Sequence, residues 1–161
     1  MATERSTGKI MKTGVILAAV IIVLRIILEH LGAPSTVNAV FGVAWLYFLL
    51  PVCLALRIAA TAEASPFKGL FLDVLLFGVY TRLMVMLTYM IAYFLKWKAP
   101  RFSASQGGVV GDNVTPLMGL LVIPARNAVY WIIFAVIVGM ILGGITLLIA
   151  RKPKKTKVDV A

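Results

Sequence analysis

The chain of 161 residues is 61% hydrophobic and only 14% charged, whereas a soluble globular domain has roughly 45–50% apolar and about 25% charged residues. This composition excludes a water-soluble particle and predicts an all-α integral membrane protein. The net charge of +10 does not indicate nucleic-acid binding, because the Lys and Arg residues are concentrated at the ends of hydrophobic segments, where they orient a membrane protein.

Four apolar segments are long enough to cross about 30 Å of hydrocarbon at about 1.5 Å per residue. Gly32, Ala33 and Pro34 end the first segment, and Ser35 or Thr36 can cap the helix that follows. We predict a four-helix bundle in a single domain, with basic tails before and after it. In chain order the predicted parts are the tail 1–12, the spans 13–31, 38–60, 69–95 and 127–150, and the tail 151–161.

The distribution of Lys and Arg residues predicts the orientation of the helices, because cytoplasmic loops carry an excess of positive charge. With the N-terminus inside, ten of the 16 Lys and Arg residues lie on the inner side and four on the outer side, while Arg25 and Arg82 lie within the spans. We therefore predict that both termini are cytoplasmic and that the chain crosses the inner (plasma) membrane of a bacterium several times. The basic tails can also bind anionic lipids.

The loop 96–126 holds a further apolar segment, Thr115–Pro124. One helix from Thr115 to Ala150 would be about 54 Å long, which exceeds the bilayer, and Pro124 disfavours helical geometry at the preceding residue. We therefore predict a separate segment that lies in the interface or re-enters the outer leaflet as a lid. An extracellular plug on the bundle and one overlong, tilted helix are the alternatives.

Arg25, Glu29 and Arg82 are the first candidates for function, because an ionisable group within the bilayer is costly unless it is paired or hydrated. Both arginines are predicted near the middle of the membrane, and Glu29 follows Arg25 by four residues on the same helix face. Two cations and one anion leave one positive charge unmatched. This charge favours an anion, a carbonyl-bearing ligand or a partner's carboxylate; the alternative is satisfaction by backbone groups and water.

Two further residues are predicted to contact a ligand or a partner, Tyr89 and Arg126. Tyr89 belongs to a stripe on one helix face, which would either line a pocket open to the outer leaflet or form a packing seam. The stripe consists of Arg82, Met86, Tyr89 and Tyr93. Arg126 is predicted near the level of Glu29, where it would compete for that carboxylate.

Other residues are predicted to have structural roles. Arg57 and Asp73 lie at the same predicted depth on neighbouring helices, so we expect a structural ion pair between them. Gly139 and Gly143 form a GxxxG pattern, which lets another helix approach closely, either within the bundle or at a dimer seam.

The sequence offers little catalytic chemistry. Single copies of cysteine (Cys53) and histidine (His30) exclude an internal disulfide, a thiolate metal cage and a haem held by two histidines of this chain. The sequence also lacks a phosphate-binding loop, a metal-ligand spacing and a plausible Ser–His–Asp set. We therefore expect no catalytic residues, no metal and no cofactor, and the sequence favours a non-catalytic protein over an enzyme.

The first functional hypothesis is an accessory or assembly subunit of a larger membrane complex, in which a membrane-protein partner or a second copy of the chain completes the unmatched charge. The alternative is a small transporter or binding protein for an anionic lipid, an organic anion or a quinone, held by Arg25 and Arg82. In either case the lipid bilayer surrounds the chain.

Overall fold

The computed structural model describes residues 4–61 and 63–151, which are helical apart from the connecting loops. Within these residues an isolated bridge pairs Ser103 with Val110, and no strand is formed. The prediction of an all-α fold is confirmed. The α-helices are α1 (Glu4–His30), α2 (Ser35–Val40), α3 (Leu46–Ala59), α4 (Pro66–Leu95) and α5 (Ile123–Ala150), and the short turns are η1 (Val43–Trp45), η2 (Pro100–Phe102), η3 (Ala104–Gln106) and η4 (Met118–Val122).

Four stretches of the described chain are long and apolar enough to cross a membrane, as predicted. They are Thr7–His30, Thr36–Ala59, Pro66–Leu95 and Met118–Ala150. The first lies within α1, which already begins at Glu4, so helix extends into the predicted N-terminal tail. The predicted C-terminal tail lies outside the described residues except for Arg151.

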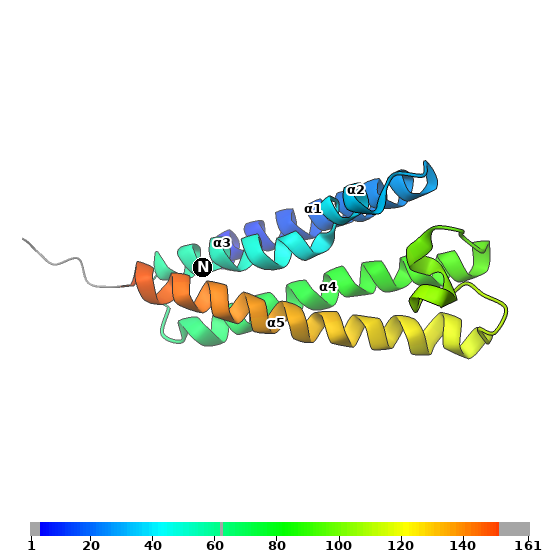
Figure 1. Cartoon of the computed structure of the whole chain (residues 1–161). Coiled ribbons are helices and arrows are strands. Elements are labelled where there is room, and N and C mark those ends of the chain that lie inside the picture. The colour runs from blue at the N-terminus through cyan, green and yellow to red at the C-terminus, as the bar shows by residue number, and fades with distance from the viewer. Residues whose placement is uncertain (1–3, 62, 152–161) are drawn as a thin grey trace, which may run out of the picture.

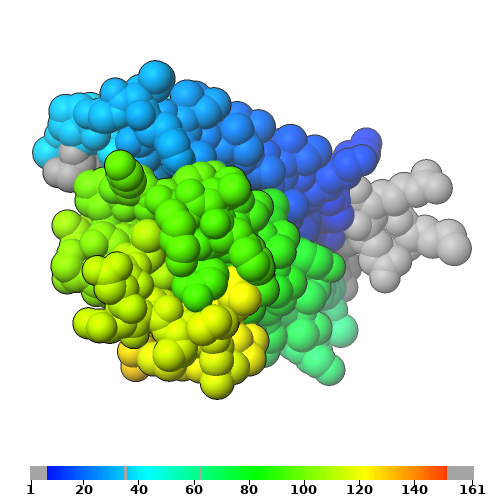
Figure 2. Space-filling view, turned by 90° about the vertical axis from the view of Figure 1, so that its right-hand side faces the viewer, coloured from blue at the N-terminus to red at the C-terminus, as the bar shows by residue number. Residues whose placement is uncertain are grey.

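The helices lie alongside one another, and the described chain begins and ends at the same end of the bundle (Figure 1). We call this the terminal end. Residues 96–117 connect α4 to the helix that follows and fold over the opposite end, which we call the capped end. Figure 2 looks onto the capped end and shows this loop, in green and yellow-green, beside the blue surface of α1 and α2.

The main core lies between α1, α3, α4 and α5. Its fully buried members are large apolar side chains such as Tyr47, Leu54 and Phe77. Outward-facing positions on the long helices are apolar too, for example Ile16, Leu83 and Ile137. An apolar exterior of this extent would be unfavourable in water and is compatible with a multi-pass membrane protein.

Glycines set how closely α5 packs. Gly139 and Gly143 are buried, and a Cβ added at Gly139 would lie 2.6 Å from Val74 Cγ1 and 3.1 Å from Pro51 Cγ. A Cβ at Gly143 would lie 3.1 Å from the carbonyl oxygen of Pro51. The structure therefore places the GxxxG pattern within the bundle, against α3 and α4.

The segment before α5 is continuous with it, which differs from the separate segment predicted for Thr115–Pro124. Helical backbone runs from Pro116 through η4, a π-helical turn, into α5. Pro124 is the second residue of α5. The π-helical turn shifts the hydrogen-bond register just before this proline, which has no backbone N–H of its own to donate. The predicted break in the backbone at Pro124 is therefore absent.

A break occurs instead in the second span, which was predicted as one helix over 38–60. α2 ends at Val40, Gly42 has an extended conformation (φ −98°, ψ 135°), and η1 then leads into α3. This interruption borders the cavity described below.

Candidate functional site

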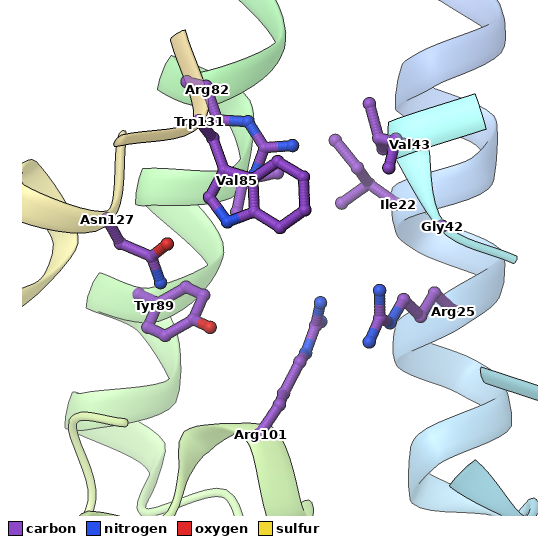
Figure 3. A pocket seen from close by; sticks show the side chains of 11 residues that line it. Ile22, Arg25, Gly42, Val43, Arg82, Val85, Tyr89, Arg101, Asn127 and Trp131 are labelled. Carbon is purple, nitrogen blue, oxygen red and sulfur yellow. The ribbon is translucent and has the colours of Figure 1, made fainter. Parts of the chain in front are cut away.

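A cavity of about 160 Å³ lies between α1, α4, α5 and the capping loop. Figure 3 shows the side chains that surround it, with arginines entering from three different elements. Its lining combines cations, aromatic rings and apolar side chains: Ile22, Arg25, Gly42, Val43, Ala44, Arg82, Val85, Tyr89, Arg101, Asn127 and Trp131.

Arg82 of α4 is buried, with only 7% of its surface exposed. Its Nε donates a hydrogen bond of 2.7 Å to the hydroxyl of Tyr47. The guanidinium carbon lies 4.6 Å from the centre of the Trp131 ring and 5.2 Å from that of Tyr47. Within the described residues no carboxylate lies within 4 Å of Arg82. Aromatic faces and a hydroxyl group therefore hold this cation without a counter-ion.

The position of Tyr47 is fixed in turn by Thr81. The two hydroxyl oxygens are 2.8 Å apart, and Thr81 Oγ1 donates to the carbonyl oxygen of Phe77 at 2.9 Å. Because a threonine hydroxyl has a single proton, Tyr47 donates to Thr81 and accepts from Arg82. This chain of hydrogen bonds orients Arg82 towards the cavity.

Glu29 lies between two of the arginines that line the cavity. Arg25 Nε donates to Glu29 Oε1 at 2.9 Å, and Arg101 Nε lies 2.7 Å from Oε2. The Glu29 side chain is 3% exposed. The Nε and Nη2 atoms of Arg101 are buried, and neither makes a hydrogen bond of regular geometry within the described residues. Donor capacity therefore remains on Arg101 beside the cavity.

The capping loop positions Arg101. The neighbouring Phe102 is fully buried, with its ring centre 5.1 Å from that of Tyr89 and 5.4 Å from that of Trp97. The backbone N–H of Val110 donates to the Phe102 carbonyl oxygen at 2.7 Å. Burial lowers the pKa of Arg101, while the Glu29 carboxylate raises it. An arginine nevertheless keeps its charge in a protein.

The charges around the cavity do not balance. Arg25, Arg82 and Arg101 line it, and Glu29 pairs with two of them. Three positive charges and one negative charge leave +2. Charges removed from water cost several kcal/mol each unless they are paired. The site is therefore suited to a negatively charged group.

Neutral polar groups and an interrupted helix complete the site. The hydroxyl of Tyr89 and the amide of Asn127 face the same space as the arginines (Figure 3). Gly42, at the break between α2 and η1, lines the opposite wall. Non-helical backbone at membrane depth is tolerated where protein or a hydrated cavity surrounds it, and discontinuous helices form binding sites in many transporters.

No family model, curated protein or solved structure matches the chain. Within the described residues no group of three His, Cys, Asp or Glu side chains is placed to hold a metal ion.

The structure brings together four of the residues that the sequence singled out: Arg25, Arg82 and Tyr89 line the cavity, and Glu29 adjoins it. It places Arg126 elsewhere. That residue is exposed and lines a surface depression with residues of the capping loop. Its predicted role beside Glu29 is taken by Arg101.

The predicted ion pair between Arg57 and Asp73 is absent from the described residues, where the ion pairs are those of Glu29. Leu54, Ala55 and Ile58 form the buried face of α3, and Arg57 lies on its exposed face. The prediction considered only the depth of the two residues, whereas the rotation of α3 about its axis puts Arg57 on the exposed face of that helix.

Three polar or aromatic residues of the lining were not predicted: Arg101, Asn127 and Trp131. Asn127 and Trp131 were assigned to the start of the last span as boundary residues, and Arg101 was counted as one of the outer charges. The sequence signal for Arg101 is the adjacent Phe102, one of two large aromatic residues in this loop, the other being Trp97. Such a residue indicates that the loop is anchored to the bundle.

Proposed function

We propose that this protein is a multi-pass membrane protein that binds an anionic group in the arginine-lined cavity, at the outer end of the bundle. The observation that carries the proposal is the net charge of +2 around the cavity, to which the buried Arg82 contributes. The excess of Lys and Arg on the terminal side supports cytoplasmic termini in a bacterial inner membrane, so the capped end faces outward.

The size of the cavity limits what can enter it. Pockets for drug-sized ligands have volumes of roughly 300–1,000 Å³, whereas a cavity of about 150 Å³ can hold a molecule the size of benzene. At about 160 Å³, the cavity accommodates a headgroup rather than a whole lipid. The candidates are the charged end of an anionic lipid, a small organic anion and the carbonyl end of a quinone.

The same excess charge supports a second candidate, an accessory or assembly subunit of a membrane complex. A helix of a partner protein could bring a carboxylate to the arginines. In that case the cavity would be completed by protein, and loss of Arg82 would release the partner.

Native mass spectrometry of the protein, extracted gently from its own membranes, tests the proposal. We expect the wild-type chain to carry one reproducible anionic molecule. Arg82→Met should lose it while keeping its helical content, because an apolar side chain of similar length can fill the space. Arg126→Met is the matched control, since it removes an exposed arginine at the same end, and it should keep the ligand.

Two results would count against anion binding. A wild-type chain that carries no small molecule but co-purifies with a defined protein, which Arg82→Met then releases, would favour the subunit. A ligand that both variants retain would show that it binds outside the cavity.

A further inference from the structure

The three arginines approach the cavity from different directions. Arg25 comes from α1, Arg82 from α4 and Arg101 from the capping loop, and their guanidinium groups face a common space (Figure 3). A guanidinium group is a planar fork of donors that matches two oxygens of a phosphate or a carboxylate. A carboxylate has two oxygens, and so does the charged part of a phosphate diester. A phosphate monoester has three, which suits three arginines arranged around it.

The net charge of the cavity also favours a phosphate monoester. The cavity has an excess of +2, the sum of three arginines and one glutamate. A carboxylate or a phosphate diester carries one negative charge, whereas a phosphate monoester carries about −1.5 to −2 at pH 7. Of these three groups only the monoester comes close to neutralising the cavity, and a charge that is removed from water without a partner is unfavourable.

The volume is also that of a phosphate group. A water molecule takes up about 30 Å³ of the liquid, so the cavity of about 160 Å³ corresponds to roughly five water molecules. A phosphate group, with five non-hydrogen atoms, therefore fits within the cavity.

An aromatic groove on α5 adjoins the cavity. Trp131 lines both, and Tyr130 and Phe134 complete the groove. Tyr130 is 66% exposed and Phe134 is 38% exposed. The surrounding surface of α5 is apolar, including Ile133 and Ile137. A hydrocarbon chain attached to a phosphate in the cavity can therefore lie against α5 on a surface suited to lipid.

On these grounds we propose that the ligand is a lipid ending in a phosphate monoester, with its phosphate among Arg25, Arg82 and Arg101 and its hydrocarbon chain along the Tyr130–Trp131–Phe134 groove. This inference rests on the proposed anion-binding function. It names the chemical class of the ligand and commits to a lipid rather than a soluble phosphate.

Titrations of the purified full-length protein in a non-ionic detergent, followed by native mass spectrometry, test the proposal. The probes are dioleoyl phosphatidic acid (a monoester lipid), dioleoyl phosphatidylglycerol (a diester lipid), oleate and glycerol 3-phosphate. We expect phosphatidic acid to bind at least tenfold more tightly than each of the others. Its advantage over phosphatidylglycerol should shrink severalfold below about pH 6, where a phosphate monoester loses its second charge.

Variants connect the binding to the cavity. Arg82→Met and Arg101→Met should each weaken phosphatidic acid binding at least tenfold, whereas Arg126→Met should leave it unchanged. If Arg82→Met does not fold, Arg101→Met still provides the test, because its side chain is supplied by the capping loop and not by a helix of the main core.

The remaining outcomes separate the inference from the function on which it rests. Equal affinity for phosphatidylglycerol and phosphatidic acid would overturn the assignment of the ligand as a phosphate monoester but would leave the proposed anion binding intact. If glycerol 3-phosphate binds as tightly as phosphatidic acid, the assignment of the ligand as a lipid is overturned. Binding of none of the four probes, or binding unaffected by both cavity variants, would overturn the proposed function together with the inference.

Discussion

Arg82 keeps its charge within the bundle through aromatic rings and a hydroxyl group. A desolvated cation–π contact contributes about 2 kcal/mol, and Arg82 has two such contacts, with Tyr47 and Trp131, besides its hydrogen bond. The cost of removing an ion from water is several kcal/mol. These contacts hold the guanidinium group in place but bring no negative charge to it. Arg82 can therefore still form an ion pair with a bound anion.

Glu29 keeps Arg25 and Arg101 together, so its charge should matter for stability. We expect Glu29→Gln to lower the free energy of unfolding by about 2 kcal/mol. This is less than the 3–5 kcal/mol typical of breaking a buried pair, because the Arg25 side chain is 29% exposed. Thermal unfolding in detergent measures the loss. Glu63→Gln removes an equal charge that has no ion pair among the described residues, and an equal loss there would contradict the prediction.

Residue chemistry identified part of the site directly from the sequence. Arg25, Glu29 and Arg82 stand out because they interrupt apolar segments, where ionisable groups are rare. Arg101 does not stand out, because it lies in a polar loop among other charges. Burial of Phe102 against Tyr89 brings Arg101 to the cavity, and that packing is a tertiary contact.

At the scale of elements, the helix interruption that the sequence predicted and the one that the structure shows lie at different places. Pro124 was expected to separate Thr115–Pro124 from the last span, yet helical backbone continues from the π-helical turn through Pro124 into α5. No feature of the sequence predicted a break at Gly42, where the structure has one. A proline restricts the backbone locally, so its effect can be anticipated from the sequence. The break at Gly42 is instead associated with a tertiary feature, because Gly42 lines the cavity and lies beside Arg25.

The close packing of α5 gives a test at the same scale. We expect Gly139→Ala to lower the free energy of unfolding by roughly 1–3 kcal/mol through overpacking, because the new Cβ would lie 2.6 Å from the stiff side chain of Val74. Gly78→Ala is the matched control. Its Cβ would lie 3.6 Å from Ala135 Cβ, which is an ordinary contact. If both variants lose the same stability in thermal unfolding, the close packing at Gly139 does not account for the loss.

At the scale of the whole molecule, one end of the bundle carries the chain ends and the other carries the site. At the terminal end, Arg151 Nη2 donates to the carbonyl oxygens of Ile58, Thr61 and Glu63 at 3.3–3.4 Å. These contacts tie the end of α5 to the connection between α3 and α4. At the capped end, the loop after α4 closes over the cavity.

The proposed orientation can be tested with single cysteines. In a Cys53→Ala background, Asp112→Cys places a thiol in the capping loop and Lys9→Cys places one near the start of α1; both positions are exposed. On spheroplasts of a bacterial host, a membrane-impermeant maleimide should label position 112 and should label position 9 only after permeabilisation. The reverse pattern would invert the topology and place the cavity towards the cytoplasm.

The sequence by itself determined the all-helical fold and the four membrane-length spans, because hydropathy over about 20 residues is a local property of the chain. It also identified four of the residues now found at or beside the cavity. Only the tertiary structure decided that Arg101 replaces Arg126, that Arg57 lies on the exposed face of α3, and that Gly42, Asn127 and Trp131 line one space with the arginines. The rotation of a helix about its axis and the course of a loop depend on which side chains pack together, and this packing joins residues far apart in the sequence.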